Sequence, residues 1–298
     1  MAHLPSRSFG SVSVAMVTPF NPNGSIDIDS ALKVADKLVS DGCDALVLSG
    51  TTGESPTTHQ PEKNELVREV KAAVGERAMI VAGAGSNDTA HAVRIAKGAA
   101  ESGADGLLVV SPYYNRPSQE GVYQHIVAIA DSTDLPVMVY DIPGRTGVAI
   151  ADDTLDRLAE HPQIKAVKDA TGDVPQGFER ITRTGLEYYS GDDALNFAWL
   201  AHGASGVVSV AGHVIASGLR ALVTEVDDGD LPAARAEFAK QAPIIDAIMG
   251  GGQGAVMAKE AMKLLGVIPS AAVRLPLVGA SAAEIDKLRS ALQADGYL

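Results

Sequence analysis

The sequence has few aromatic residues, one cysteine and no long apolar run. Aromatic residues make up 4% of 298 positions, with seven Tyr, five Phe and one Trp. Cys43 has no partner for an internal disulfide, and beside an apolar run it is expected to be a small buried hydrophobe. No stretch of 18 uninterrupted apolar residues occurs, and the first ten residues lack the apolar core of a secretory signal. We therefore expect a cytoplasmic protein with no membrane-spanning helix.

Positive charge is also scarce. The chain carries 24 Lys and Arg against 37 Asp and Glu, a net charge of −13. Nucleic-acid binding needs a basic footprint, so neither a nucleic acid nor an anionic membrane is an expected partner. The seven His show no metal-ligand spacing and there is one Cys, so no metal site is expected. An anionic substrate would have to meet a local positive centre.

Short β-branched runs alternate with longer helical patterns along most of the chain. The runs are Val12–Val17, Ala45–Ser49, Met79–Ala82, Gly106–Val110, Val137–Tyr140, Ile164–Lys168, Leu186–Ser190 and Gly206–Val210. Their mean spacing is about 28 residues, the length of one strand–helix unit. Near-continuous apolar strands with helical crossovers predict a parallel sheet covered on both faces.

Eight strand–helix units favour a closed barrel. Gly42, Gly103 and Gly203 each stand where a helix must end just before a strand, and Gly readily adopts the left-handed conformation this requires. We predict an α/β fold, a (β/α)8 TIM barrel, which typically takes about 250 residues. A doubly wound open sheet is the alternative, but the Gly-rich nucleotide turn is absent after the first strand.

Beyond Val210 the sequence indicates helices only. Breaks fall at Asp227–Asp230, at Gly250–Gly254, which we interpret as a turn between helices, and at Pro269–Pro276. The first of these helices can close the barrel, and the others form a C-terminal helical appendage. We therefore predict a catalytic barrel over residues 1–224 and a helical domain over residues 225–298.

Lys168 is the sharpest chemical signal. Of eleven lysines, only Lys165 and Lys168 fall in a predicted strand. Alternation places Ile164, Ala166 and Lys168 on one face, with Lys168 at the carboxyl end, where barrel active sites lie. Burial lowers the pKa of a lysine and yields the neutral amine that attacks a carbonyl. The alternative interpretation is a lysine paired with Asp169 or another carboxylate at the barrel rim.

Polar segments follow two other predicted strands. Gly50–Ser55 combines glycines with hydroxyls, which suits a small carboxylate. It is equally consistent with an ordinary turn in which Glu54 or Ser55 caps the next helix. Asp192 and Asp193 could bind a cation, but helix capping is the simpler interpretation.

Phenols and a guanidinium complete the candidates. Tyr114 and Tyr140 stand at strand ends and could relay protons, although a tyrosine at a rim is commonly only amphipathic. Arg145 follows a Pro-Gly turn and could bind a carboxylate through two hydrogen bonds. A surface salt bridge is the alternative role for this arginine.

Four segments carry a resemblance to a known family. They are Gly50–Glu54, Tyr113–Gly121, Tyr140–Gly147 and Val167–Gly172. In this order they resemble the dihydrodipicolinate synthase family of pyruvate-dependent Schiff-base enzymes, and the variants present are similar to those of actinobacterial members. The resemblance extends over essentially the whole chain, including the helical tail. It implies a lyase that condenses pyruvate with L-aspartate 4-semialdehyde to 4-hydroxy-tetrahydrodipicolinate, in lysine and diaminopimelate biosynthesis.

The resemblance also implies catalytic roles. Lys168 would form an imine with pyruvate, which becomes an enamine and attacks the aldehyde carbon of the semialdehyde. Thr51, Tyr140 and Tyr114 would form the proton relay, with Tyr114 reaching into the site of a neighbouring subunit. The imine on the protein itself would do the chemistry, so no external cofactor is expected.

Substrate contacts follow from the same resemblance. Thr52, with nearby backbone amides, would hold the pyruvate carboxylate, and Arg145 the carboxylate of the semialdehyde. Gly191 and Val208 match positions whose main chain lines the pyruvate pocket. Family members imply a homotetramer built as a dimer of dimers.

Two other functions compete with this one. N-acetylneuraminate lyases and 2-keto-3-deoxy sugar acid aldolases share the lysine and the tyrosine, but the combination of Arg145 and Tyr114 favours the synthase. A non-catalytic barrel is disfavoured because the set of catalytic residue types is complete. Asp141 stands where many members have Asn, and its role is left open, as are those of Tyr188 and Tyr189.

The resemblance also bears on regulation by lysine. Ser55, Asn87 and Tyr113 match the allosteric pocket of lysine-inhibited members. His91 stands where those members have Glu. Gln60 and Lys63 stand where many members have His. Loss of a carboxylate and gain of a cation should weaken binding of cationic lysine.

We therefore predict weak or absent inhibition by lysine. The measurement is the initial rate of condensation during titration with lysine into the millimolar range. A nearly constant rate is expected because the pocket has lost the carboxylate that would pair with the ligand's ammonium group. Strong inhibition in this titration would contradict the prediction.

Overall fold

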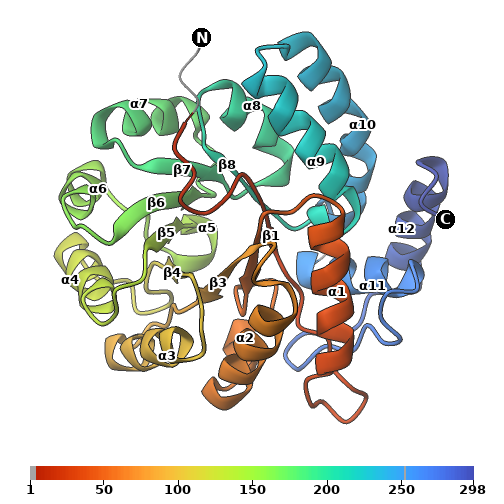
Figure 1. Ribbon diagram of the computed structural model, residues 1–298, viewed down its shortest axis with the longest axis horizontal. Coiled ribbons are helices and arrows are strands. Elements are labelled where there is room, and N and C mark those ends of the chain that lie inside the picture. The colour runs from red at the N-terminus through yellow and green to blue at the C-terminus, as the bar shows by residue number, and fades with distance from the viewer. Residues whose placement is uncertain (1–4, 252) are drawn as a thin grey trace.

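The fold is a closed barrel of eight parallel strands that follow one another in chain order (Figure 1). A computed structural model describes residues 5–251 and 253–298. Residues 1–4 of the predicted catalytic barrel, and Gly252 in the predicted turn between helices, lie outside the described residues. Pairing of β1 with β8, Ser13 opposite Val208, closes the barrel. The predicted TIM barrel is thus confirmed, and the open sheet is excluded.

The strands lie close to their predicted positions, with no end displaced by more than two residues. They are β1 Val12–Ala15, β2 Ala45–Leu48, β3 Met79–Gly83, β4 Gly106–Val110, β5 Val137–Asp141, β6 Ile164–Asp169, β7 Glu187–Ser190 and β8 Gly206–Ser209. Gly42, Gly103 and Gly203 have φ of 110°, 90° and 94°, as predicted for helix ends that require the left-handed region.

Helices surround the barrel and continue beyond it. Around the strands lie α1 Ile28–Ser40, η1 Ser55–Thr57, α2 Gln60–Val74, α3 Thr89–Glu101, α4 Gln119–Ala130, α5 Pro143–Thr146, α6 Asp152–Ala159, α7 Val174–Thr184, η2 Asp193–Leu195, α8 Asn196–Ala201 and α9 Gly212–Asp227. The appendage consists of α10 Leu231–Met249, α11 Gly254–Leu264 and α12 Ala282–Ala294. Among the described helices, none is both long and apolar enough to cross a bilayer.

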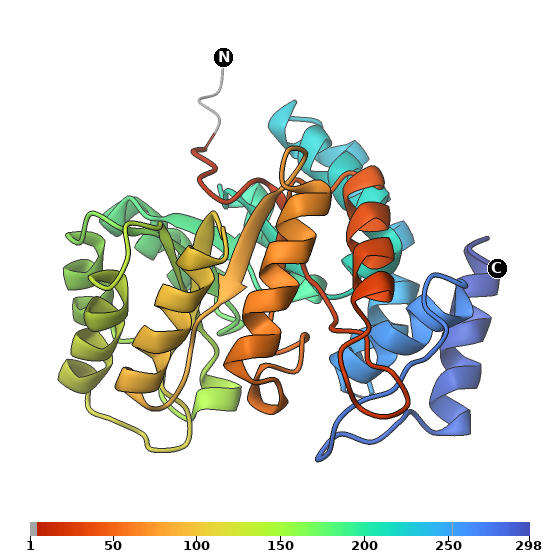
Figure 2. The ribbon, with the colours of Figure 1, turned by 60° about the horizontal axis from the view of Figure 1, so that its bottom comes forward.

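The appendage lies against the barrel. α9 packs on β1, α10 packs along α9, and α12 packs on α10. In Figures 1 and 2, α11 and α12 lie on the same side of the barrel as α1. The predicted division between residues 224 and 225 falls inside α9, and the assignment of two domains stays a prediction.

Aliphatic side chains fill the barrel interior together with Phe9, Tyr140 and Tyr189, while a larger core lies between strands and helices. Tyr189 belongs to the interior, where its hydroxyl accepts a hydrogen bond from the Phe9 backbone N–H at 3.2 Å. Tyr188 faces outward and stacks on Trp199, with ring centroids 6.0 Å apart. These contacts give both tyrosines a place in packing.

The alternation predicted for β6 is wrong at its first residue. Ile164 belongs to the outer core, whereas Ala166 belongs to the interior. Val137 of β5 pairs with Ile164, but the next residue, Met138, pairs with Ala166. Lys165 is therefore an extra residue in a bulge, and a bulge resets which face each side chain occupies. Beyond it the alternation holds.

Candidate active site

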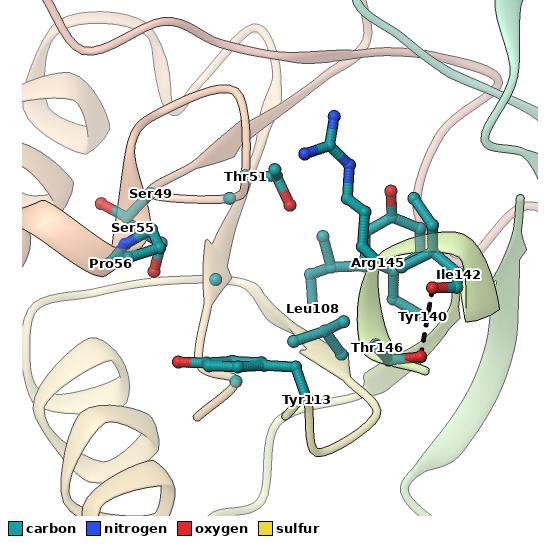
Figure 3. Close-up of a pocket in the computed structure, with 14 residues that line it drawn as sticks. Ser49, Thr51, Ser55, Pro56, Leu108, Tyr113, Tyr140, Ile142, Arg145 and Thr146 are labelled. Carbon is teal, nitrogen blue, oxygen red and sulfur yellow. Dashed lines mark hydrogen bonds between the residues drawn. The ribbon is translucent and has the colours of Figure 1, made fainter. Parts of the chain in front are cut away.

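A cavity of about 220 Å³ opens at the carboxyl ends of β2 to β5 (Figure 3). Its lining residues are Ser49, Gly50, Thr51, Ser55, Pro56, Gly83, Gly85, Leu108, Val110, Tyr113, Tyr140, Ile142, Arg145 and Thr146. The cavity lies at the end of the barrel where sites are expected. It brings together the polar segments that follow β2, β4 and β5.

Lys168 lies beside this cavity, on β6 and in register with Tyr140 of β5. Its side chain is 4% exposed, and its Nζ is 4.3 Å from the centroid of the Tyr140 ring. Burial lowers the pKa of Lys168 to about 8, an effect that Asp193 opposes and Arg145 reinforces. An appreciable fraction of the amine is then neutral near physiological pH, as a nucleophile requires.

The competing pairing of Lys168 with Asp169 does not occur. The two side chains point to opposite faces of β6, and Asp169 accepts hydrogen bonds from the backbone N–H and hydroxyl of Thr171 at 2.9 and 2.7 Å. Asp169 also lies 3.8 Å from Arg180 on the outer side of the barrel.

Asp192 and Asp193 act as structural acceptors. Asp192 accepts a hydrogen bond from the Ala194 N–H at 3.0 Å and so begins η2. Asp193 is buried and accepts from the N–H groups of Val210 and Ala211 at 2.9 and 2.8 Å. Asp192 thus satisfies the expectation of capping, whereas Asp193 lies inside η2 and bonds the backbone that follows β8. Within the described residues, no group of three or more His, Cys, Asp or Glu is placed to hold a metal ion.

Tyr140 carries a protonated phenol into the cavity. It is 5% exposed, and burial raises its pKa to about 12 while Arg145 opposes that rise. Figure 3 shows Thr51, Arg145 and Tyr140 facing the same space. A phenol that keeps its proton at neutral pH can donate a hydrogen bond to an oxygen that becomes negative.

The predicted binding residues occupy two regions. Thr52 is buried and lines a second cavity of about 180 Å³, which shares Thr51 and Arg145 with the first. Gly191 lies against the lysine, since a Cβ there would be 3.0 Å from the Cε of Lys168. Val208 lies within the barrel interior.

Tyr114 stands apart from these residues in the single chain. Its side chain is 88% exposed and its φ is 74°, whereas the neighbouring Tyr113 lines the cavity. The predicted reach into a neighbouring subunit is compatible with this exposure and stays a prediction.

The predicted allosteric residues are divided. Ser55 and Tyr113 line the first cavity, at the carboxyl ends of β2 to β5, whereas His91 is exposed on α3. The carbonyl of Asn87 accepts a hydrogen bond from the Asn115 amide at 2.8 Å. Lys63 donates to the Ser55 hydroxyl at 2.9 Å, and burial lowers its pKa to about 8.

Sequence reasoning missed a pair of buried carboxylates behind the site. Asp141 and Asp169 directly follow Tyr140 and Lys168, and they are register partners on β5 and β6. Both are fully buried, 4.0 and 3.8 Å from the Arg180 guanidinium. Burial, with Asp169 nearby, raises the pKa of Asp141 to about 7. The repeated pattern of a functional residue followed by Asp was the available signal.

It also missed the partner of Glu54. The alternative interpretation of Glu54 as a helix cap is wrong, because no side-chain cap bond exists at η1. The Glu54 carboxylate instead forms a buried ion pair with Lys259 of α11. A lysine within the apolar face of a helix was the only trace of this contact in the sequence.

The chain matches the family model described as Dihydrodipicolinate synthetase family over residues 8–295. Relatives named 4-hydroxy-tetrahydrodipicolinate synthase include those of Bifidobacterium longum (strain NCC 2705), 50% identical over 99% of this chain and 97% of the relative, and Corynebacterium diphtheriae, 51% identical over 98% and 96%. The enzyme of Cyanidioschyzon merolae, solved with lysine bound, is 41% identical with a TM-score of 0.94, over 98% of this chain and 100% of that one. A chloride-inhibited dihydrodipicolinate synthase from Acinetobacter baumannii complexed with pyruvate is 36% identical with a TM-score of 0.93, over 97% and 99%.

The raised pKa of Asp141 predicts a pH-dependent gain in stability for Asp141→Asn. Between about pH 4 and pH 7 the folded chain keeps a proton that the unfolded chain, with an ordinary pKa of 3.8, has lost. The free energy of unfolding of the wild type therefore falls as pH rises through this window. The advantage of the variant should grow by up to about 1.4 kcal/mol per pH unit. Urea unfolding at several pH values measures it.

Asp152→Asn is the matched control. Asp152 also contacts Arg180, at 2.7 Å, but there the guanidinium lowers the carboxyl pKa. Its contribution to stability is complete above pH 3.8 and is lost only below that value, so the effect of Asp152→Asn should stay constant between pH 4 and pH 7. A stability difference for Asp141→Asn that does not change with pH would show that Asp141 ionises normally in the folded chain.

Proposed function

The chain belongs to the dihydrodipicolinate synthetase family, and we propose that it condenses pyruvate with L-aspartate 4-semialdehyde through an imine on Lys168. Its activity is the 4-hydroxy-tetrahydrodipicolinate synthase reaction, a lyase reaction of lysine and diaminopimelate biosynthesis. The observation that carries the mechanism is the buried Lys168 amine at the carboxyl end of β6, beside the Tyr140 ring.

The first stage joins pyruvate to the protein. The neutral Nζ of Lys168 attacks the ketone carbon, and the addition product loses water to give a protonated imine. The positive nitrogen withdraws electrons, so a proton leaves the pyruvate methyl group and an enamine forms. Burial favours this stage twice, because it supplies the neutral amine and keeps bulk water from the imine.

The second stage forms the carbon–carbon bond. The enamine carbon attacks the aldehyde carbon of the semialdehyde. The former aldehyde oxygen then takes a proton through the relay of Tyr140, Thr51 and Tyr114. The substrate's amino group then attacks the imine carbon, closes the ring and releases the Lys168 amine. The condensation involves no net oxidation or reduction, and the protein-bound imine serves in place of an external cofactor.

Two groups of hydrogen-bond donors orient the anionic substrates. Thr52 and the backbone amides of the segment after β2 hold the pyruvate carboxylate, while the backbone at Gly191 and Val208 bounds its other side. Arg145 binds the carboxylate of the semialdehyde. It lines both cavities, so its guanidinium can reach a substrate that extends from one into the other.

Assembly of subunits would complete the site. We propose a cytoplasmic homotetramer in which Tyr114 contributes its phenol to a neighbouring subunit, because the side chain is 88% exposed in the single chain. One structural neighbour, 36% identical, is described as a monomeric variant, so assembly differs among related proteins.

A lysine pocket formed by Ser55, Asn87, His91 and Tyr113 belongs to the proposal as a weak site. The Lys63 amine, 2.9 Å from the Ser55 hydroxyl, adds positive charge beside it. Like charges repel, so a cationic ligand is disfavoured there.

Borohydride reduction in the presence of pyruvate tests the imine directly. We expect the protein to gain the mass of one reduced pyruvyl group, with the modified peptide containing Lys168. Lys168→Ala should abolish the gain because, among the described residues, it removes the one lysine at the site end of a barrel strand. Mass spectrometry of the intact chain and of its peptides measures both.

Lys165→Ala is the matched control, since Lys165 lies on the same strand but is exposed. This variant should trap pyruvate as the wild type does. A wild-type protein that forms no adduct, or forms it at Lys165, would remove the proposed mechanism.

Arg145→Ala tests how the second substrate is bound. A hydrogen bond between charged groups contributes about 1.5–3 kcal/mol, so we expect kcat/KM for the semialdehyde to fall roughly 10- to 100-fold. Pyruvate trapping should persist, because the imine forms without this arginine. Arg157→Ala is the control, since Arg157 pairs with Glu120 on the exterior. Full activity of Arg145→Ala with the semialdehyde would contradict the assigned role.

A further inference from the structure

The segment that holds pyruvate in the proposed function ends at a residue with an unusual backbone. Glu54 has a φ of 56°, in the left-handed region that side chains rarely occupy, and it is 2% exposed. Burying a carboxylate is unfavourable unless partners satisfy it. Both of its oxygens are satisfied, one by Lys259 and the other by the Arg274 backbone N–H at 2.9 Å. Both partners come from the C-terminal appendage.

Lys259 joins three distant parts of the chain. Its ammonium donates to Glu54 and to the Ala272 carbonyl at 2.8 Å, and it lies 4.0 Å from the centroid of the Phe20 ring. The side chain is fully buried, although most of the other buried residues of α11 are apolar. Arg274 extends the junction, because its guanidinium bonds the Thr57 carbonyl at 2.7 Å and stacks on Phe20.

Local backbone hydrogen bonds connect Glu54 to the substrate segment. The Glu54 N–H donates to the Thr51 carbonyl and the Ser55 N–H to the Gly50 carbonyl, each at 3.1 Å. The Thr18 hydroxyl donates to the Gly53 carbonyl at 2.8 Å. A Cβ on Gly53 would meet backbone atoms at 3.0 and 3.1 Å, so the turn has little room to change. A shift of Glu54 must therefore move Thr51.

The geometry points to Lys259 as a positioning residue for the reaction: through its ion pair with Glu54, the C-terminal appendage holds Thr51 and Thr52 where pyruvate binds. The pair is more than a support for folding. A buried ion pair can often be replaced by neutral residues without loss of stability, so stability alone does not account for it. This inference rests on the proposed function, which places pyruvate against these two threonines.

The test uses the double variant Lys259→Met with Glu54→Gln. It removes both charges together, so no unpaired charge is left in the core, and Gln keeps an acceptor for the Arg274 N–H. We expect a folded protein whose kcat/KM for pyruvate falls roughly 10- to 100-fold, mainly through KM, because the threonines lose their position. The KM for the semialdehyde, which Arg145 binds from α5, should change little.

Two controls separate folding from positioning. Lys71→Met with Asp105→Asn removes a second lysine–carboxylate pair, 2.7 Å apart, that joins α2 to the start of β4 at the opposite end of the barrel. It should leave both KM values unchanged. The near-ultraviolet signal of Trp199, which is fully buried beside α7, reports whether each variant is folded.

The outcomes are distinct. A wild-type protein that does not trap pyruvate on Lys168 removes the proposed function, whatever the variants do. A wild type that traps pyruvate and a folded double variant with unchanged KM for pyruvate overturn the role of Lys259. Should the double variant not fold, Glu54→Gln alone decides, because it keeps the size of the side chain but removes the charge and one of the two acceptors that bind the appendage. A raised KM for pyruvate alone supports the inference, and two unchanged KM values overturn it.

Discussion

Removal of the Lys168 amine from water is the constraint on which the rest of the site depends. An ammonium group inside a barrel of aliphatic side chains loses its hydration, and the protein responds by holding the proton less tightly. The amine thereby becomes a nucleophile at a pH where an exposed lysine would be almost fully charged. The neighbouring Tyr140 responds in the opposite sense, because burial of a phenol disfavours its anion. Burial thus supplies a neutral amine on β6 and a protonated phenol on β5, in register on adjacent strands.

The strand alternation separates this chemistry from the support behind it. Tyr140 and Lys168 face the site, and the residues after them, Asp141 and Asp169, face the helices, where Arg180 lies near both. The carboxylates sit close to the reactive groups in sequence, yet the strands keep them on the other face. Burial raises the pKa of both carboxyls, and their nearest cation is Arg180 on the outer side of the barrel. Neither carboxyl therefore pairs with the Lys168 amine on the opposite face of β6.

Much of this arrangement could be predicted from local sequence patterns. Strand positions, the helix-ending glycines and the place of Lys168 depend on features within a few residues, and they appear in the structure nearly as expected. The bulge at Lys165 could not be predicted, because it depends on the register with β5. The pairing of Glu54 with Lys259 joins residues 205 positions apart, and no local pattern encodes such a contact. The proposed contact of Tyr114 with a neighbouring subunit also lies beyond what one chain can show, and it stays a proposal.

The rate of imine formation as a function of pH tests the central claim most directly. Rapid mixing with pyruvate, followed by borohydride quenching at each pH, gives the rate at Lys168 without the later steps. We predict a rate that rises with pH and levels off with a midpoint near pH 8, the value to which burial lowers the pKa of Lys168. A rate that continues to rise toward pH 10.5, the ordinary value for lysine, would contradict the account.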